Sequence, residues 1–321
     1  MEICLSGEKP DRVPVALWRH FPVDDQSAEA LASAVIAFQD QFDFDLVKVT
    51  PASSFCLRDW GMQDVWKGNP EGTREYGAPL IKSPEDWEKP RVLDPNHGFL
   101  SQQVSSLSII CDYFKRKQVP VLQTVFSPIS QAKNLVGKTN LLDHLHNHSD
   151  YLLHGLRIIT DSTLRFIEAC YKARPDGFFY AMQYAQTDLV TKNEFARFFH
   201  PFDLEIQTAF GDYWLNMGHI HGDHILFDEI KDYSFPILNW HDRQTEPDLA
   251  TAKSVFPGVV CGGLRQWDTL VYGDAAMVRS EAEAAIRKTD GTRFILSTGC
   301  VTPVIAPFGN LMAARKIVDI A

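Results

Sequence analysis

The sequence predicts an α/β fold, a (β/α)8 TIM barrel formed by residues 1–321 as a single domain. Eight short apolar runs with strand character alternate along the chain with amphipathic helical stretches. The length of 321 residues is also typical of one such barrel. The alternative is an open doubly wound sheet, but no Gly-x-Gly-x-x-Gly motif follows the first strand.

The expected strands are apolar runs bounded by glycine, proline or polar residues. They span 13–18, 44–49, 119–126, 177–183, 216–221, 235–240, 258–262 and 293–297. Hydrophobic spacing predicts helices from Ser27 onward and over 101–116, 151–171, 193–214 with an interruption at Pro201, 223–232, 246–255, 274–289 and 308–319. Residues 129–149 are expected to be helical or mixed.

Residues 58–96 have no regular hydrophobic pattern and contain three tryptophans among glycines and prolines. Such a connection is long for a compact domain. We expect it to form a short hairpin insertion or a lid near the mouth of the barrel cleft.

The overall charge and the cysteine pattern argue against several classes of protein. A net charge of −10 and a pI near 5.5 disfavour binding to the phosphates of nucleic acids. No apolar run approaches the roughly 18 residues that would span a bilayer, and the N-terminus does not resemble a signal peptide. The six cysteines are scattered, unlike those of a disulfide scaffold. We therefore expect a cytoplasmic protein without nucleic-acid or membrane partners.

Two short motifs at strand ends contain metal-ligating side chains. His219 and His221 are two residues apart, so on a strand both side chains project from the same face. Cys300 follows the last apolar strand across a glycine turn. Two imidazoles and one thiolate with an open fourth position are typical of catalytic zinc, and His224 is a substitute ligand if the next helix begins early. The alternative is that the histidines cap secondary structure and the cysteine is buried and inert.

Other polar side chains also follow barrel strands, and the carboxyl ends of barrel strands meet at one rim. This rim supplies candidate acid–base residues and substrate contacts: Trp18, Arg19, His20, Gln183, Tyr184, Asn239, His241 and Asp242. The alternative for the pair 241–242 is that it caps the following helix, and polar strand ends such as 183–184 are common. We expect one pocket to be lined by Arg19, His20, Gln183, His219, His241 and Cys300.

Four segments together resemble the uroporphyrinogen decarboxylase superfamily. They are Trp-Arg-His-Phe-Pro at 18–22, His-Ile-His-Gly-Asp at 219–223, Val-Cys-Gly-Gly-Leu at 260–264 and Thr-Gly-Cys-Val-Thr-Pro at 298–303. The resemblance covers nearly the whole chain and is strongest after about residue 215. It implies a single (β/α)8 barrel with a deep cleft at the C-terminal rim. The superfamily has two well-known branches, which are cofactor-free decarboxylases and zinc methyltransferases that move methyl groups between corrinoids and thiols.

The resemblance is nearer to the methyltransferase branch. That branch has His-x-Cys after strand five and a cysteine after strand eight, and all three side chains bind zinc. His219 and Cys300 match this pattern, but His221 stands where the branch has cysteine, which leaves the site one charge unit more positive. The decarboxylase branch has Arg-Gln-Ala-Gly-Arg after its first strand, whereas this chain has Arg19 followed by His-Phe-Pro without the second arginine.

The resemblance therefore implies zinc-assisted methyl transfer to a small acceptor from a methylated corrinoid protein or a folate. The chain lacks the Asp-x-His-x-x-Gly motif that holds cobalamin, so a corrinoid donor would be a separate protein, and no tightly bound organic cofactor is expected. The alternative is a metal-free decarboxylase (lyase) of a carboxylated or tetrapyrrole substrate, in which Arg19, His20, His241 and Asp242 bind carboxylates and transfer protons. A third hypothesis is a barrel that binds a small ligand without catalysis.

Overall fold

A curled parallel sheet of seven strands forms the centre of the structure, a computed structural model that describes residues 1–211 and 213–319. The strands are β1 (Val47–Val49), β4 (Val121–Phe126), β5 (Gly177–Met182), β6 (Met217–Ile220), β7 (Ile237–Trp240), β8 (Val259–Leu264) and β9 (Phe294–Thr298). They are paired in this order, and every pair is parallel. The fold is TIM-barrel-like, as the sequence predicts.

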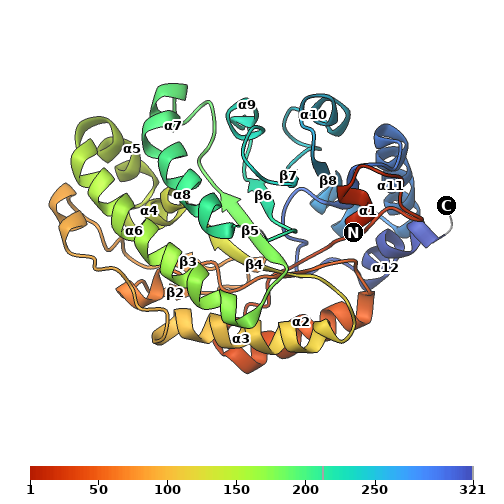
Figure 1. Cartoon of the computed structure of the whole chain (residues 1–321), viewed down its shortest axis with the longest axis horizontal. Helices are drawn as coiled ribbons and strands as arrows, with labels where there is room; N and C mark the ends of the chain where they lie inside the picture. Colours follow the sequence, from red (N-terminus) through yellow and green to blue (C-terminus); the bar gives the residue numbers. More distant parts are fainter. Residues whose placement is uncertain (212, 320–321) are drawn as a thin grey trace.

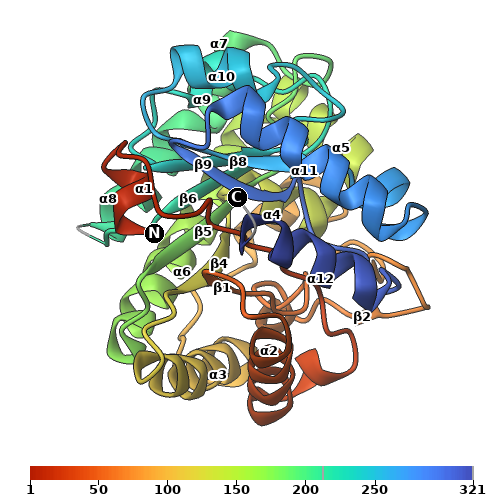
Figure 2. The same cartoon turned by 90° about the vertical axis from the view of Figure 1, so that its right-hand side faces the viewer.

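Helices form an arc around the outside of the sheet (Figures 1 and 2). They are α1 (Glu2–Leu5), α2 (Ala28–Phe42), α3 (Gly98–Lys115), α4 (Pro128–Val136), α5 (Lys138–Asn147), α6 (Ser149–Cys170), α7 (Lys192–Phe198), α8 (His200–Phe210), α9 (Phe227–Ile230), α10 (Leu249–Val255), α11 (Ala275–Thr289) and α12 (Phe308–Lys316). Ser27 caps α2 by accepting a hydrogen bond from the backbone N–H of Ala30, as its side-chain type predicts. Among the described residues, none of these helices has the length and apolar character needed to cross a membrane.

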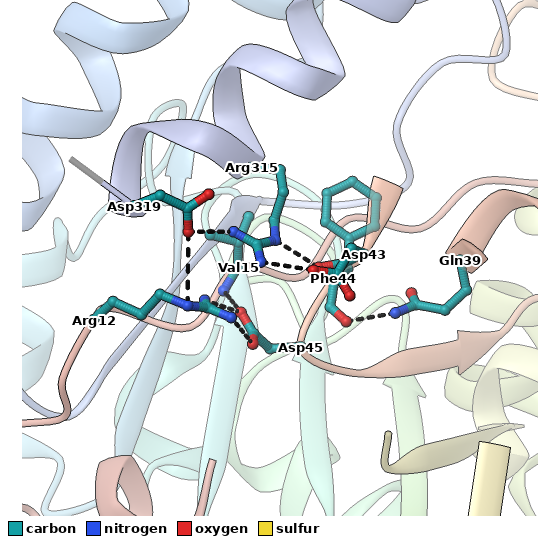
Figure 3. A network of polar contacts seen from close by, with 8 residues as sticks. All are labelled: Arg12, Val15, Gln39, Asp43, Phe44, Asp45, Arg315 and Asp319. Atoms are coloured by element: carbon teal, nitrogen blue, oxygen red, sulfur yellow. Dashed lines mark hydrogen bonds and ion pairs between the residues drawn. The ribbon is translucent and has the colours of Figure 1, made fainter. Parts of the chain in front are cut away.

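The expected first strand, residues 13–18, is not a regular strand, and this part of the eight-strand prediction is wrong. Only Val15 pairs with β9, through one parallel bridge to Leu296. Pro14 has no backbone N–H, and the N–H of Val15 is taken by the carboxylate of Asp45 at 2.7 Å (Figure 3). The backbone N–H of Asp45 in turn donates to the carbonyl of Val15 at 2.8 Å. An irregular segment therefore occupies the position between β9 and β1 that a regular eighth strand would fill.

Two expected helices differ from the structure for local reasons. The helix expected over 223–232 contracts to α9, because His224 has a left-handed backbone with a φ of 50°. The helix expected over 193–214 is interrupted at Phe199 rather than at Pro201. Pro201 lies in the first turn of α8, where backbone N–H groups have no partner within the helix, so a proline costs no hydrogen bond there. The loop that follows β6 is consequently longer than expected.

Side chains on each strand alternate between the inside of the sheet and the surrounding helices. The inner wall is apolar over most of its depth and includes Leu46, Leu122, Phe179, Met217, Ile237, Val259 and Ile295. Two residues farther along several strands, the inward positions become polar, as at Lys48, His219 and Asn239. Polar groups therefore gather at the C-terminal end of the barrel interior, next to an apolar layer.

Residues 58–96 contain a short antiparallel hairpin, β2 (Asp64–Val65) and β3 (Glu75–Tyr76). A buried ion pair attaches this hairpin, because Arg74 lies 3.0 Å from a carboxylate oxygen of Asp25. A second pair, 3.5 Å long, joins Arg74 to Asp64 within the hairpin itself. The loop of the hairpin also accepts a hydrogen bond at the carbonyl of Pro70 from the backbone N–H of Val304 at 2.7 Å. The hairpin thus contacts the loop that follows β9.

The other end of this segment is fixed by Trp87, which is fully buried against α6. Its Nε1–H donates to Nδ1 of His144 on α5 at 3.0 Å. A Cβ atom built on Gly155 of α6 would lie 2.2 Å from Cε3 of the Trp87 ring. Gly155 is therefore required by the close approach of the indole.

We predict that Gly155→Ala destabilises the protein, because the added methyl group displaces a fully buried indole. The free energy of unfolding, measured by urea denaturation, should fall by about 1–3 kcal/mol. The matched control is Gly309→Ala in α12, where nothing lies within 4 Å of the new Cβ atom. This control should leave stability unchanged or raise it by up to about 1 kcal/mol. Equal stability of the two variants would contradict the packing described here.

Candidate metal centre

Three histidines and one cysteine converge at the C-terminal rim of the barrel. His219 lies on β6, His221 follows that strand, His241 follows β7, and Cys300 lies two residues after β9. One ligand atom from each of the four residues lies within 4.8 Å of all the others. Nδ1 of His221 is 3.7 Å from the Cys300 sulfur and 3.5 Å from Nε2 of His241. Four side chains from three strands can therefore reach one central atom.

The orientation of His219 is fixed by Asn239 on the neighbouring strand. The Asn239 amide donates to the carbonyls of Cys261 and Thr298 at 2.9 and 3.0 Å, so its oxygen faces the other way. That oxygen lies 2.7 Å from Nδ1 of His219, which must then donate to it. The Nε2 atom of His219 keeps its lone pair and is free to ligate a metal. A hydrogen bond to the remaining ring nitrogen is the usual support of a metal-binding histidine.

Burial keeps the imidazoles of the cluster neutral. Loss of solvent, together with neighbouring positive charge, lowers the pKa of His221 to about 3 and that of His219 well below its ordinary value. Burial also lowers the pKa of His241 and raises that of the Cys300 thiol to about 11. Neutral imidazoles are the form that binds metals, whereas the thiol has to lose its proton when a metal binds.

The donor set and the spacing both suit zinc. Zinc prefers nitrogen and sulfur ligands in a tetrahedron, in which neighbouring ligand atoms are about 3.3–3.7 Å apart. The distances of 3.5 and 3.7 Å around Nδ1 of His221 agree with this range. The sequence predicts His219, His221 and Cys300 as ligands, and the structure brings them together. His241 joins them although its position in the sequence indicates acid–base chemistry, whereas His224 is exposed and lies outside the cluster.

Arg19 lies apart from this cluster. Its guanidinium carbon is 5.3 Å from the ring centre of Phe21 and 5.7 Å from that of Phe38 on α2. It lines an apolar hollow between α2 and the start of α12, outside the barrel. Trp18 points into the barrel, so the next residue along this extended segment points outward. The expectation that Arg19 lines the same pocket as Cys300 is therefore wrong.

Trp18 and His20 lie on the inner side, near β1. The Trp18 ring meets the ring of Phe179 edge to face, with 5.4 Å between their centres. His20 is buried beneath Gly72 of the hairpin loop, whose position leaves no room for a Cβ atom. The Nε1 atom of Trp18 and the Nδ1 atom of His20 are buried without a hydrogen-bond partner among the described residues.

The remaining candidates have different surroundings. Gln183 is half-buried and its backbone N–H donates to the Ser130 hydroxyl at 2.8 Å. Tyr184 has a φ of 70°, and its ring centre lies 5.3 Å from the amine of Lys133.

Asp242 is turned toward β8, where its carboxylate accepts a hydrogen bond from the N–H of Gly263 at 3.1 Å. Burial raises the pKa of Asp242 to about 7. Asp242 therefore supports the end of β8 and does not face the cluster.

Two charged residues near the cluster were not predicted from the sequence. Lys48 is buried on the inner face of β1, and its amine lies 4.6 Å from the ring centre of Phe179. The signal that could have identified it is a lysine at a strand position whose side chain faces the barrel interior, where the other inward-facing residues are apolar. Glu71, from the hairpin loop, accepts a hydrogen bond from Nε1 of Trp267 at 3.2 Å, and its charge raises the pKa of His241 and Cys300. No local pattern in the sequence distinguishes Glu71.

The fold and the cluster define a TIM-barrel-like α/β protein with histidine and cysteine side chains gathered at the C-terminal rim. The profile of the uroporphyrinogen decarboxylase (URO-D) family matches residues 3–320. The chain belongs to this family. No curated protein matches the chain in sequence.

Solved structures support the same fold. A methyltransferase from Methanosarcina mazei is 18% identical, with a TM-score of 0.86 over 99% of this chain and 96% of the other. A B12-independent methionine synthase from Shewanella, in complex with selenomethionine, is 13% identical, with a TM-score of 0.54 over 97% and 94% of the two chains. A putative vitamin-B12 independent methionine synthase from Listeria monocytogenes is 11% identical, with a TM-score of 0.55 over 98% and 96%. At these identities the likeness establishes the fold.

We predict that Asn239→Ala weakens zinc binding about 10- to 100-fold, because His219 loses the partner that fixes its ring and tautomer. The dissociation constant can be measured by competition with a chromophoric chelator. The control is Asn310→Ala, which removes a buried amide bound to the carbonyls of Leu270 and Gly273, away from the cluster. This control should lower stability without changing zinc affinity. Equal zinc affinity of native protein and Asn239→Ala would refute the supporting role of Asn239.

Proposed function

We propose that this chain is a zinc-dependent methyltransferase that transfers a methyl group from a methylated corrinoid protein or a folate to a small acceptor. The main support is the convergence of His219, His221 and Cys300 at the C-terminal rim of a URO-D family barrel. These are the positions at which the methyltransferase branch binds zinc. The Methanosarcina mazei structure, which is named a methyltransferase, aligns over 99% of the chain and gives further support.

In this proposal His219, His221 and Cys300 hold the zinc, and His241 is within reach of the fourth position. Bound zinc would lower the pKa of an acceptor thiol and so favour the nucleophilic thiolate. One thiolate among neutral imidazoles leaves a dipositive ion with a net charge of about +1. Such a centre favours binding of an anionic thiolate at the fourth position.

The protein itself orients and shields the cluster. Asn239 fixes the ring of His219, and the hairpin loop places Glu71 close enough for its charge to act on His241 and Cys300. The backbone link between Pro70 and Val304 fixes this loop against the segment that follows Cys300. We therefore propose that residues 58–96 restrict access of water to the reacting groups. Desolvation of this kind strengthens electrostatic interactions in a site.

The alternative is metal-free decarboxylation of a carboxylated substrate. It relies on Arg19, His20, His241 and Asp242 to bind carboxylates and transfer protons. The orientation of Arg19 toward Phe21 and Phe38, and of Asp242 toward Gly263, gives this alternative less support. We place it second for this reason.

The proposed partners are a small-molecule acceptor and, if the donor is a corrinoid, a separate corrinoid protein. The net charge of −10 favours neither nucleic acid nor an anionic membrane surface as a partner. All six cysteines lack disulfide partners, and a reducing compartment such as the cytoplasm suits them.

We predict that the native protein binds one zinc ion and that Cys300→Ala weakens this binding at least about 100-fold, since the thiolate is the only anionic ligand. Elemental analysis after saturation and dialysis measures the metal content, and methyl transfer to a thiol measures activity. The matched control is Cys261→Ala, which changes a fully buried cysteine of the barrel wall outside the cluster. This variant should retain the zinc.

Two results would count against the methyltransferase proposal. One is a native protein that holds no zinc after saturation. The other is retention of zinc by Cys300→Ala. Decarboxylation of a carboxylated substrate by the metal-free protein would then favour the alternative function.

A further inference from the structure

Lys48 is a buried lysine without an acidic partner. It lies on the inner face of the barrel, two residues after Leu46 of the apolar inner wall, and its residue is 8% exposed. Its amine makes no ion pair or hydrogen bond with any of the described residues and lies over the ring of Phe179. Burial lowers the pKa of this amine to about 7. Burial of an unpaired lysine is costly, so its presence here requires an explanation.

Two more unsatisfied groups lie beside it. The Nε1–H of Trp18 and the Nδ1 atom of His20 are both buried without partners in residues 1–211 and 213–319. Trp18 is 3% exposed and His20 is 7% exposed. The Trp18 ring and the Lys48 amine contact the same ring, that of Phe179. Burial lowers the pKa of His20 to about 3, and the N–H of its neutral ring donates to the backbone carbonyl of Pro51, so the unpartnered Nδ1 atom is an acceptor.

The chemistry of these groups indicates what would satisfy them. A protonated lysine amine and an indole N–H are donors only, and neither can satisfy the other. Buried donors without acceptors are destabilising, whereas an oxyanion would accept hydrogen bonds from both of them and pair with the lysine charge.

We propose that Lys48 and Trp18 form a binding site for the acid group of an organic-acid substrate, with the Lys48 amine as its charge partner and the indole N–H as a second donor. The site adjoins the histidine–cysteine cluster, since His219 stacks on the same Phe179 ring with 5.3 Å between ring centres. A small acid held there would extend its other end toward Cys300. This last step rests on the proposed function, whereas the acid-binding site itself does not depend on a metal.

The test compares 3-sulfanylpropanoate with its neutral analogue 3-sulfanylpropan-1-ol, by calorimetric titration of the full-length protein with and without zinc. The metal-free native protein should bind the acid at least about tenfold more tightly than the alcohol, as expected for a charge-assisted interaction. Lys48→Met should abolish this discrimination. Lys138→Met, which changes an exposed lysine beside Tyr184, is the control and should keep it.

A thermal measurement separates ligand binding from a structural role of Lys48. Without ligand, Lys48→Met should raise the melting temperature, because an unpaired buried charge is replaced by an apolar side chain of similar length. The acid should raise the melting temperature of the native protein but not that of Lys48→Met. A lower melting temperature for ligand-free Lys48→Met, or equal responses of both proteins to the acid, would overturn the proposal.

The experiment also distinguishes this site from other locations and from the metal centre. Loss of discrimination in Lys133→Met but not in Lys48→Met would place the acid group beside Tyr184 and refute the proposal. Acid discrimination in a protein that binds no zinc would support the acid-binding site while the proposed function fails. Zinc binding without acid discrimination would support the metal centre and overturn the acid-binding site.

Discussion

The closure of the barrel depends on Asp45. Its carboxylate accepts hydrogen bonds from the backbone of Val15 and from the Arg12 guanidinium, at 2.7–2.8 Å (Figure 3). Its own backbone N–H donates to the carbonyl of Val15. The segment around Val15 pairs with β9 on its other side. One aspartate thus connects the first and last strands of the sheet where a regular eighth strand is missing.

The candidate site depends on this closure because its parts come from both ends of the sheet. Cys300 follows β9, Trp18 is the last residue of the irregular segment, and Lys48 lies on β1. An open sheet would separate them. The inner wall that adjoins these residues is apolar. Burial of this apolar wall stabilises the fold, whereas the polar groups at the C-terminal end of the barrel interior add little hydrophobic stabilisation. The site therefore concentrates neutral imidazoles, a thiol and a lysine where an ordinary core would have aliphatic side chains.

The sequence predicted most of the fold because buried parallel strands are short apolar runs, as at residues 177–182, and because helix caps such as Ser27 have a characteristic side chain. It did not predict that residues 13–18 lack regular pairing, since the competing hydrogen bond comes from Asp45, 30 residues away. The expected barrel places the ends of β6 and β9 at one rim, which is where the structure has His219 and Cys300. Strand parity explains why Arg19, which directly follows the inward Trp18, lies outside the barrel.

The rest of the site depended on turns and on contacts between distant residues. His241 reaches the cluster because it lies in a turn, where its carbonyl accepts hydrogen bonds from the backbone of Gln244 and Thr245. Glu71 reaches it from a hairpin loop that the ion pair between Arg74 and Asp25 attaches to the barrel. Neither position follows from strand periodicity. Lys48 was predictable, because a charged residue at an inward position of a buried strand is exceptional.

The central claim is that zinc binds to histidine nitrogen and to the sulfur of Cys300. X-ray absorption spectroscopy at the zinc edge of the zinc-loaded native protein, without any added thiol, tests this claim most directly. We expect four-coordinate zinc with one sulfur at about 2.3 Å and nitrogen ligands at about 2.0–2.1 Å. Zinc surrounded only by nitrogen and oxygen, or by six ligands, would contradict it.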